Sequence, residues 1–309
     1  MVGTGKRLDV LAIGEPLMEL NQRAGETVYL PGHGGDTSNC IIAATRQGAR
    51  CGYLSAVGDD TFGRSFLELW DREGVDRSTV SVHPTAPTGI YFVTHGPKGH
   101  DFSYYRAGSA ASLVRPEEIA AEAVAGARVL HASGISSAIS TSACDAVFHA
   151  IRLAKDAGTL VSYDPNLRTR LWPLDRARAV IDATMRLADI ALPGLDDAKA
   201  LTGLDDPDRI CDQYLGYGCG MVLLTLGSEG CLAATPDARQ RIAGRKVKAV
   251  DATGAGDTFD GSFLAEYLRT GDVFRAAAYA NAAAALATQG YGAVAPMPRR
   301  AEVEAFLAG

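Results

Sequence analysis

The residues best suited to chemistry lie near the C-terminal end of the chain, in the string DATGAGD at residues 251–257. Its glycines let the backbone turn sharply and bring its amides close to a ligand. The amphipathic stretch that follows indicates a helix, so Gly254, Ala255 and Gly256 fall at a helix N-terminus, where free N–H groups attract an anion such as a phosphate. Asp257 either caps that helix or accepts the proton of a hydroxyl group that attacks phosphorus.

Two motifs resemble the signatures of a known family. DATGAGDTF at residues 251–259 is similar to the C-terminal signature of the PfkB-type, ribokinase-like carbohydrate kinases. GGDTSNC at residues 34–40, followed by an apolar run and by VGDDTFG at residues 57–63, resembles the N-terminal signature of the same family. Both motifs stand in the family's order, and the resemblance runs from Asp9 to about Pro298.

The composition fits such an enzyme. A length of 309 residues suffices for one large α/β domain, and 47% hydrophobic residues fit a soluble globule. No segment reaches the roughly 18 uninterrupted apolar residues of a membrane span, and the N-terminal run is too short for a signal peptide, so we expect a cytoplasmic location and no membrane partner. The net charge of −6 argues against non-specific binding to nucleic acid.

The cysteines give no sign of a metal site or of a disulfide framework, because they form no C-x-x-C pair and have no histidine at metal-ligand spacing. We expect six buried free thiols in a reducing compartment. They are Cys40, Cys51, Cys144, Cys211, Cys219 and Cys231.

Apolar runs alternate with helical periodicity along most of the chain, the pattern of a mostly parallel sheet flanked by helices. Strands are predicted at Leu8–Ile13, Cys51–Val57, Arg128–Ala132, Leu160–Tyr163, Ile190–Leu192 and Met221–Thr225. Helices are predicted at Asp36–Gln47, Phe62–Glu73, Pro116–Ala125, Thr141–Ala157, Arg176–Leu187, Asp206–Leu215 and Ala276–Ala287. Right-handed connections then give a three-layer α/β/α sandwich in a single domain, with ligands at the carboxyl ends of the strands. The resemblance implies that this sandwich has the ribokinase-like fold.

Two segments, Pro16–Pro31 and Gly89–Arg106, break this alternation and indicate β-hairpins. The resemblance implies that they form a small β lid over the sugar site, which would exclude water from the reaction. A plain surface hairpin is the alternative. Lid strands of the family often pair between subunits, so we expect a homo-oligomer formed through the lid.

The segment FSYYRAGSAAS at residues 102–112 looks like that of the 2-keto-3-deoxygluconate kinases within the family, which also use the form GGDT found at residues 34–37. Arg106 would then pair with the carboxylate of a sugar acid through two hydrogen bonds. The remaining substrate-binding candidates are Gly34, Gly35, Asp36, Asn39, Tyr91 and Tyr104. Tyrosine packing in an amphipathic hairpin explains the same Tyr-Tyr-Arg pattern without a ligand.

DPNLR at residues 164–168 matches a family segment between sugar and nucleotide. Asn166 is therefore a substrate candidate, and Arg168 would contact the sugar acid or stabilise the transferring phosphoryl group. A loop arginine that pairs with a nearby acid is the alternative for Arg168.

The resemblance implies that the nucleotide binds to the turn after the strand Met221–Thr225, to the glycine turn before Asp257 and to an alanine-rich helix. The residues are Thr225, Gly227, Ser228, Gly230, Gly254, Gly256 and Asn281. A simple β-turn explains Gly227, Ser228 and Gly230 without a nucleotide, and close packing of a helix through its small residues explains the alanine-rich helix that carries Asn281. The chain has neither a Walker-type phosphate loop nor a G-x-G-x-x-G after a strand, so a dinucleotide oxidoreductase is poorly supported.

The chain departs from the family at the N-x-x-E motif that helps to organise Mg2+. Gly194 replaces the asparagine, and Asp197 stands at the glutamate position with a shorter side chain. Asp197 would hold the metal through water, as Mg2+ often accepts. ATP and Mg2+ remain the expected cofactors, and the dependence on a monovalent cation stays open.

These features together predict transfer of the γ-phosphoryl group of ATP to the terminal hydroxyl of 2-keto-3-deoxygluconate. Asp251 would orient that hydroxyl, Asp257 would accept its proton, and the amides of residues 254–257 would hold the developing charge. Two alternatives remain: a fructokinase- or ribokinase-like enzyme that acts on a neutral sugar, and a non-catalytic sugar-binding regulator on the same fold.

Overall fold

A nine-stranded sheet forms the centre of the protein. The computed structural model describes residues 7–22, 25–96 and 99–309. The strand order is β13-β12-β11-β10-β9-β8-β1-β4-β5, in which β12 runs antiparallel to both of its neighbours and all other neighbouring strands are parallel. The strands are β1 Leu8–Ile13, β4 Cys51–Gly58, β5 Val80–His83, β8 Ala127–Ser133, β9 Leu160–Asp164, β10 Ile190–Ala191, β11 Met221–Thr225, β12 Gly230–Ala234 and β13 Arg239–Ala243.

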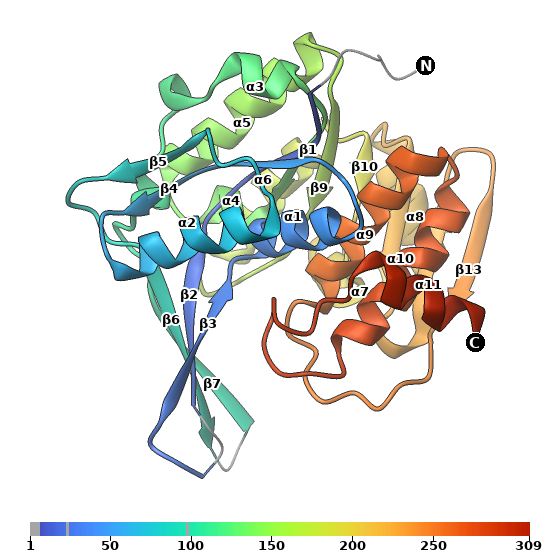
Figure 1. The fold of residues 1–309 in the computed structure, drawn as a ribbon. Helices are drawn as coiled ribbons and strands as arrows, with labels where there is room; N and C mark the ends of the chain where they lie inside the picture. The colour runs from blue at the N-terminus through green and yellow to red at the C-terminus, as the bar shows by residue number, and fades with distance from the viewer. Residues whose placement is uncertain (1–6, 23–24, 97–98) are drawn as a thin grey trace.

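Helices cover both faces of this sheet and bury two separate apolar clusters (Figure 1). One face carries α3 Ala121–Ala125, α4 Gly134–Ala138, α5 Thr141–Asp156, α6 Leu174–Met185, α7 Leu195–Thr202 and α8 Pro207–Gly216. The other carries α1 Asp36–Arg46, α2 Thr61–Glu73, α9 Ala255–Thr270 and α10 Val273–Ala287, with α11 Arg300–Ala308 packed on α10. This is the predicted three-layer sandwich.

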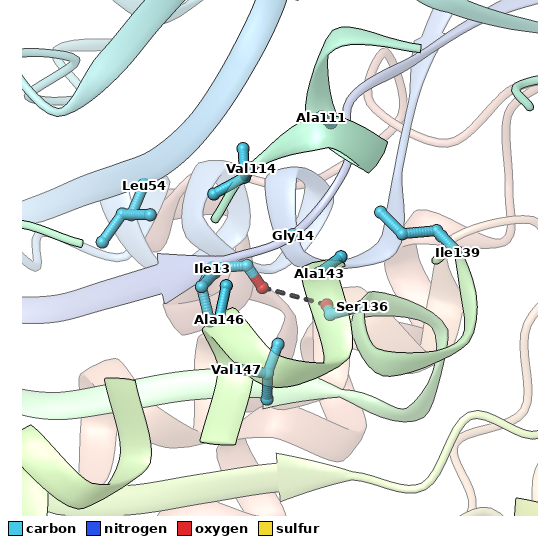
Figure 2. Close-up of a pocket in the computed structure, with 10 residues that line it drawn as sticks. All are labelled: Ile13, Gly14, Leu54, Ala111, Val114, Ser136, Ile139, Ala143, Ala146 and Val147. Atoms are coloured by element: carbon cyan, nitrogen blue, oxygen red, sulfur yellow. Dashed lines mark hydrogen bonds between the residues drawn. The ribbon is translucent and has the colours of Figure 1, made fainter. Parts of the chain in front are cut away.

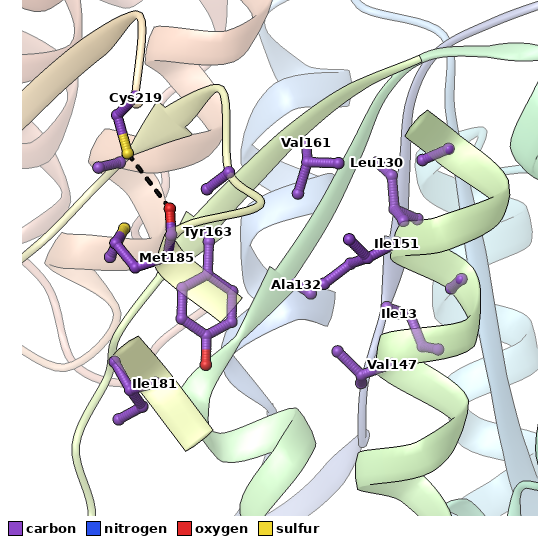
Figure 3. Packing of buried hydrophobic residues seen from close by; sticks show 14 of the residues in the cluster. Ile13, Leu130, Ala132, Val147, Ile151, Val161, Tyr163, Ile181, Met185 and Cys219 are labelled. Atoms are coloured by element: carbon purple, nitrogen blue, oxygen red, sulfur yellow. Dashed lines mark hydrogen bonds between the residues drawn. The ribbon is translucent and has the colours of Figure 1, made fainter. Parts of the chain in front are cut away.

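Burial on both sides explains why the central strands have nearly continuous apolar sequences. Figure 3 shows Val161 and Tyr163 of β9 beside Leu130 and Ala132 of β8, facing the apolar side of α5. All six cysteines are buried and free, as predicted. Within the described part of the chain, no helix is long and apolar enough to cross a membrane.

The six predicted strands are all present, and each of their ends lies within one residue of the predicted position. The helix predicted at Pro116–Ala125 is wrong as a single element. It is split into the 3-10 helix η2 (Pro116–Glu118) and α3, because Ile119 and Ala120 have extended backbone. Ile119 is thereby buried in the core.

A second sheet of four strands, in the order β3-β2-β6-β7, leaves the body as a long twisted ribbon (Figure 1). Its strands are β2 Leu17–Gln22, β3 Tyr29–Gly34, β6 Gly89–Gly96 and β7 Gly99–Tyr105. The two predicted segments are therefore hairpins, joined through a parallel pairing of β2 with β6. We call this sheet the lid.

One bond ties the lid to the loop that follows β9. Arg170 donates from Nη1 to the carbonyl oxygen of Phe102 on the edge strand β7, at 2.7 Å, and also lies 3.7 Å from the carboxylate of Asp101. A second set of bonds lies within the body, where Arg46 of α1 donates from Nη1 to the carbonyl oxygens of Val294 and Met297. These bonds fasten the C-terminal segment to α1.

Candidate active site

The DATGAGD string forms a tight turn that leads into α9. Gly254 precedes the helix with φ of +74°, a left-handed conformation that glycine adopts without strain. Asp257 lies in the first helical turn. The N–H of Ala255 donates to the carbonyl oxygen of Ala252 at 3.2 Å, so it is already paired in this turn. The first N–H groups of a helix have no carbonyl partner one turn earlier in the helix, and binding of an anion at this turn stays a prediction.

Asp257 is held from the opposite helix. Asn39 of α1 donates from Nδ2 to Oδ2 of Asp257 at 2.8 Å. Burial and, next, the negative charge of Asp36 raise the pKa of Asp257 to about 7, against the bond from Asn39 and the positive charge of Arg168, which lower it. The carboxyl group therefore titrates near neutral pH, where a general base is most effective.

The first motif, at residues 34–40, forms the start of α1. Gly35 has φ of +101° and a Cβ there would lie 2.3 Å from the carbonyl oxygen of Glu15, so only glycine fits between the lid and the helix. Asp36 accepts from its neighbour Thr37 N at 2.8 Å and from Asn166 Nδ2 at 2.9 Å. The bond to Asn166 joins the start of α1 to the carboxyl end of β9.

The loop after β9 adopts an uncommon conformation. Asn166 has φ of 29° and is the only non-glycine residue with a positive φ among the described residues. Its N–H donates to the carboxylate of Asp164. Such strain collects at functional sites. Arg168, which follows, is half-exposed and lies 3.9 Å from Asp197. The structure thus brings Asp36, Asn166, Asp257 and Arg168 together.

Two further acids belong to this cluster and were not predicted as site residues. Burial, then the charge of Asp36, raises the pKa of Asp164 well above its ordinary value. Burial, then the charge of Asp164, does the same for Asp260, which is 3% exposed on α9. The spacing of three residues between Asp257 and Asp260 was the available sequence signal, since it places both on nearby faces of one helix.

Arg106 lies at the base of the lid and is paired with a residue that was not predicted from the sequence. Its Nη2 forms a buried ion pair with Oε2 of Glu15, and Glu15 also accepts from Ser109 Oγ at 2.7 Å. The guanidinium lies 5.7 Å from the ring centre of Tyr104. Arg106 is therefore already paired with a carboxylate of the protein, whereas it was expected to pair with the carboxylate of a sugar acid.

Tyr91 and Tyr104 lie on neighbouring lid strands with stacked rings, 5.7 Å between centroids. The hydroxyl of Tyr91 donates to the carboxylate of Glu19, a buried residue on β2. Burial is the largest of the effects that raise the pKa of Glu19. The predicted ring packing is therefore present, and Tyr104 is the more exposed of the two tyrosines.

Asp251 accepts hydrogen bonds within its own loop, and its predicted role of orienting an acceptor hydroxyl stays a prediction. Its Oδ1 accepts from the N–H and the hydroxyl of Thr253, at 2.9 and 2.7 Å. Its Oδ2 accepts from Gly292 N at 2.9 Å. These bonds fix the approach to α9, which is where the site needs rigidity.

The nucleotide candidates gather at the carboxyl ends of β10 and β11. Thr225 ends β11 and forms a bridge with Gly194. The next residues form the 3-10 helix η3 (Gly227–Glu229), followed by Gly230 at the start of β12. Ser228 in this turn is exposed. Asn281 of α10 donates to the carbonyl oxygen of Ala243, so its amide group stabilises the end of β13.

The metal candidate already has protein partners. Oδ2 of Asp197 accepts from Leu167 N at 2.9 Å, and burial raises the pKa of its carboxyl group, opposed by the charge of Arg168. Among the described residues, no three acidic, histidine or cysteine side chains form a metal-binding group. A water-mediated contact with Mg2+ remains a prediction.

A small cavity lies apart from this cluster, between the end of β1 and α5 (Figure 2). Its volume is about 10 Å3, enough for one water at most, and its lining is largely apolar. Ser136 donates from Oγ to the carbonyl oxygen of Ile13 at its edge. The cavity is a packing defect and not a substrate site.

A comparison with known proteins identifies the family of this chain. The pfkB family of carbohydrate kinases matches residues 9–300, and the chain belongs to that family. A 2-dehydro-3-deoxygluconokinase of Thermoproteus tenax is 38% identical over 96% of this chain and 93% of its own length. Fructokinase-1 of Zea mays is 32% identical over 98% of each chain.

The fold has similar solved structures. A crystal structure from E. coli described as a candidate ribokinase, in complex with ATP and Mg2+, superposes with a TM-score of 0.91. It is 29% identical and covers 97% of this chain and 99% of its own. The ribokinase-like fold predicted from the two motifs is confirmed.

Proposed function

We propose that this protein is an ATP-dependent kinase that phosphorylates the terminal hydroxyl of 2-keto-3-deoxygluconate to give 2-keto-3-deoxy-6-phosphogluconate. The environment of Asp257 carries the proposal: a helix N-terminus, the bond from Asn39 and a pKa of about 7. A carboxyl group with this pKa is partly ionised at neutral pH and can accept a proton from an alcohol as that alcohol attacks.

In the proposed reaction the acceptor oxygen forms a bond to the γ-phosphorus, and the bond from that phosphorus to the β–γ bridging oxygen breaks, which releases ADP. Asp257 takes the hydroxyl proton. The backbone N–H groups of Gly254, Ala255 and Gly256 hold the negative charge on the phosphoryl oxygens. Asp251 keeps this loop in place through its bonds to Thr253 and Gly292.

For the nucleotide we propose the turn after β11, where Thr225, Gly227, Ser228 and Gly230 present backbone and hydroxyl groups at the strand ends. The complex of the E. coli relative with ATP and Mg2+ supports ATP and Mg2+ as the cofactors. Mg2+ supplies charge neutralisation of the phosphates when bound. Asp197 is the residue we propose to contact it, through water.

The proposed acceptor carries a carboxylate, which requires a cation. Arg168 is the better candidate, because its charge is only weakly compensated by Asp197 at 3.9 Å, whereas Arg106 is paired with Glu15. Polar groups for the acceptor's hydroxyl and keto oxygens come from the lid and from α1. We propose Gly34, Gly35, Asp36, Asn39, Tyr91, Tyr104, Arg106 and Asn166 as the lining of this subsite.

The Glu15–Arg106 pair also favours a second candidate, a kinase of a neutral sugar such as fructose. A neutral ion pair at the base of the lid offers hydrogen bonds without net charge. The similarity to the maize fructokinase supports the same reading. The two candidates differ in whether the acceptor needs a carboxylate.

A coupled ADP-release screen distinguishes these candidates. We expect the highest kcat/KM with 2-keto-3-deoxygluconate, lower values with its galactonate epimer, and the lowest with fructose, ribose and adenosine. A preference for fructose would transfer the assignment to the neutral-sugar kinase. ADP release with none of the five acceptors would favour a non-catalytic sugar-binding protein.

The same assay tests the base. Asp257→Asn should lower kcat at least about 100-fold while nucleotide binding, measured by calorimetry, stays near the wild-type value, because the change removes proton transfer and not ground-state contacts. Wild-type turnover in this variant would overturn the mechanism.

A further inference from the structure

The bond between Asn39 and Asp257 joins two helices that lie far apart in the sequence. Asn39 is 3% exposed on α1 and donates from Nδ2 to Oδ2 of Asp257 at 2.8 Å. Its own Oδ1 is buried and has no hydrogen-bond partner among the described residues. One end of the amide is therefore committed to Asp257, and the other end is open to a ligand.

The packing of α1 on α9 fixes this geometry. A Cβ on Gly261 of α9 would lie 2.1 Å from the carbonyl oxygen of Cys40 and 2.8 Å from Cβ of Ala43. The helices therefore approach as closely as a glycine permits. Asn39 is anchored in its helix by the bond from its N–H to the carbonyl oxygen of Gly35. A short amide side chain at this position reaches Asp257 without freedom to swing away.

The surroundings of Asp257 would otherwise oppose its ionisation. Acidic groups face it from three elements: Asp36 on α1, Asp164 at the end of β9 and Asp260 on its own helix. Among the residues that the structure describes, Arg168 on the loop after β9 is a cation that faces it, and Tyr91 of the lid and Cys40 of α1 are further titratable neighbours. The amide of Asn39 stabilises the ionised carboxylate without adding charge.

We propose that Asn39 is a positioning residue that holds Asp257 in the orientation and the ionised form needed to accept the substrate proton. The role deepens the proposed function and rests on Asp257 as the base. It is separate from any contact of Asn39 with the acceptor, because the two roles use opposite ends of one amide group. Loss of the donor should change the pH dependence of turnover, whereas loss of a sugar contact should change the KM for the acceptor.

The test compares pH profiles of kcat/KM for the acceptor that is best in the ADP-release screen. In Asn39→Leu, of similar shape but without a donor, the acid limb should move up by about one pH unit, a roughly tenfold loss of rate at pH 6. In Asn39→Asp, two adjacent carboxyl groups share a proton, so the limb should move further. The isosteric Asp variant decides the question if the Leu variant does not fold.

Ser38→Ala is the matched control. Ser38 precedes Asn39 on α1 and accepts from Trp70 Nε1, away from the cluster of acids, so its loss perturbs the helix and leaves the acid limb in place. A raised acceptor KM in both Asn39 variants with an unmoved acid limb would overturn the proposal and leave Asn39 as a sugar contact. If Asp257→Asn retained wild-type turnover, the proposed base itself would fail, so the two failures are distinguishable.

Discussion

Asp260 lies one helical turn beyond Asp257, and it is buried beside other acidic residues. Its pKa is raised well above the ordinary value by burial first and then by Asp164, Asp257 and Asp36. The folded protein therefore keeps a proton on Asp260 at pH values where the unfolded chain has released it. Stability from this group is greatest below the unfolded-state pKa near 4 and is lost as the pH rises towards the raised value.

Asp260→Asn should remove that pH dependence. Relative to the wild type, the variant should gain stability as the pH rises from about 5 to 8, with a slope of up to ~1.4 kcal/mol per pH unit for one proton. Thermal unfolding at several pH values measures the difference. Asp156→Asn, at an exposed position on α5, is the control. A stability difference that stays constant with pH would contradict the assignment.

At the scale of single residues, the sequence predicted most of the cluster but not its internal pairing. Asp36, Asn166, Arg168 and Asp257 were identified from motifs, and the structure brings them together. The partner of Arg106 could not be predicted, because Glu15 lies far from Arg106 in the sequence and outside both motifs. Such pairing depends on tertiary structure alone.

Among the elements, α1 and α9 matter most, because each supplies one side of the site. Their contact depends on Gly261, where no Cβ fits against Cys40. Close packing of this kind tolerates little added volume, and relief requires the two backbones to separate. Separation would also lengthen the bond from Asn39 to Asp257.

Gly261→Ala should therefore affect both stability and activity. We expect a loss of about 1–3 kcal/mol in the free energy of unfolding, as for other overpacked sites, and a lower kcat with the acid limb displaced upward. Denaturant titration and the pH profile measure the two effects. Gly216→Ala on α8, where a Cβ meets nothing within 4 Å, should be neutral or stabilising. Equal behaviour of both variants would contradict the packing argument.

Three strands of the central sheet were not predicted. Strands β5 and β13 lie at the sheet edges with mostly exposed side chains, so they lack a continuous apolar pattern. Strand β12 is buried along its length, but its residues directly follow the glycine turn and were assigned to that turn alone. The division of Pro116–Ala125 into η2 and α3 reflects the burial of Ile119 against the core, a tertiary effect that overrides helical periodicity.

At the scale of the whole molecule, the lid and the body are linked by the bond from Arg170 to the carbonyl oxygen of Phe102. This bond satisfies an acceptor on the edge strand β7 and holds the lid near the loop that carries Asn166 and Arg168. Both side chains of the accompanying Arg170–Asp101 pair are exposed, so the link is weak enough to break and reform.

Arg170→Ala should loosen the lid without unfolding the body. We expect the KM for the acceptor to rise about two- to fivefold, the size of one exposed hydrogen bond, with the thermal unfolding midpoint nearly unchanged. Steady-state kinetics and calorimetry provide the measurements. Arg178→Ala is the matched control, because Arg178 donates to the carbonyl oxygen of Ala200 in the body. A raised KM in the control alone would refute the role of Arg170.

The contact between α1 and α9 also has a consequence for biosynthesis. Asn39 and Asp257 are 218 residues apart, so at about 5–20 residues per second α1 leaves the ribosome roughly 10 to 40 s before its partner exists. Ile41 and Ile42 belong to the apolar cluster that α9 helps to cover, so that cluster stays incomplete during that interval. A chain interrupted before α9 therefore lacks the helix that completes the covering of α1. The proposed active site is complete only when nearly all of the chain has been made.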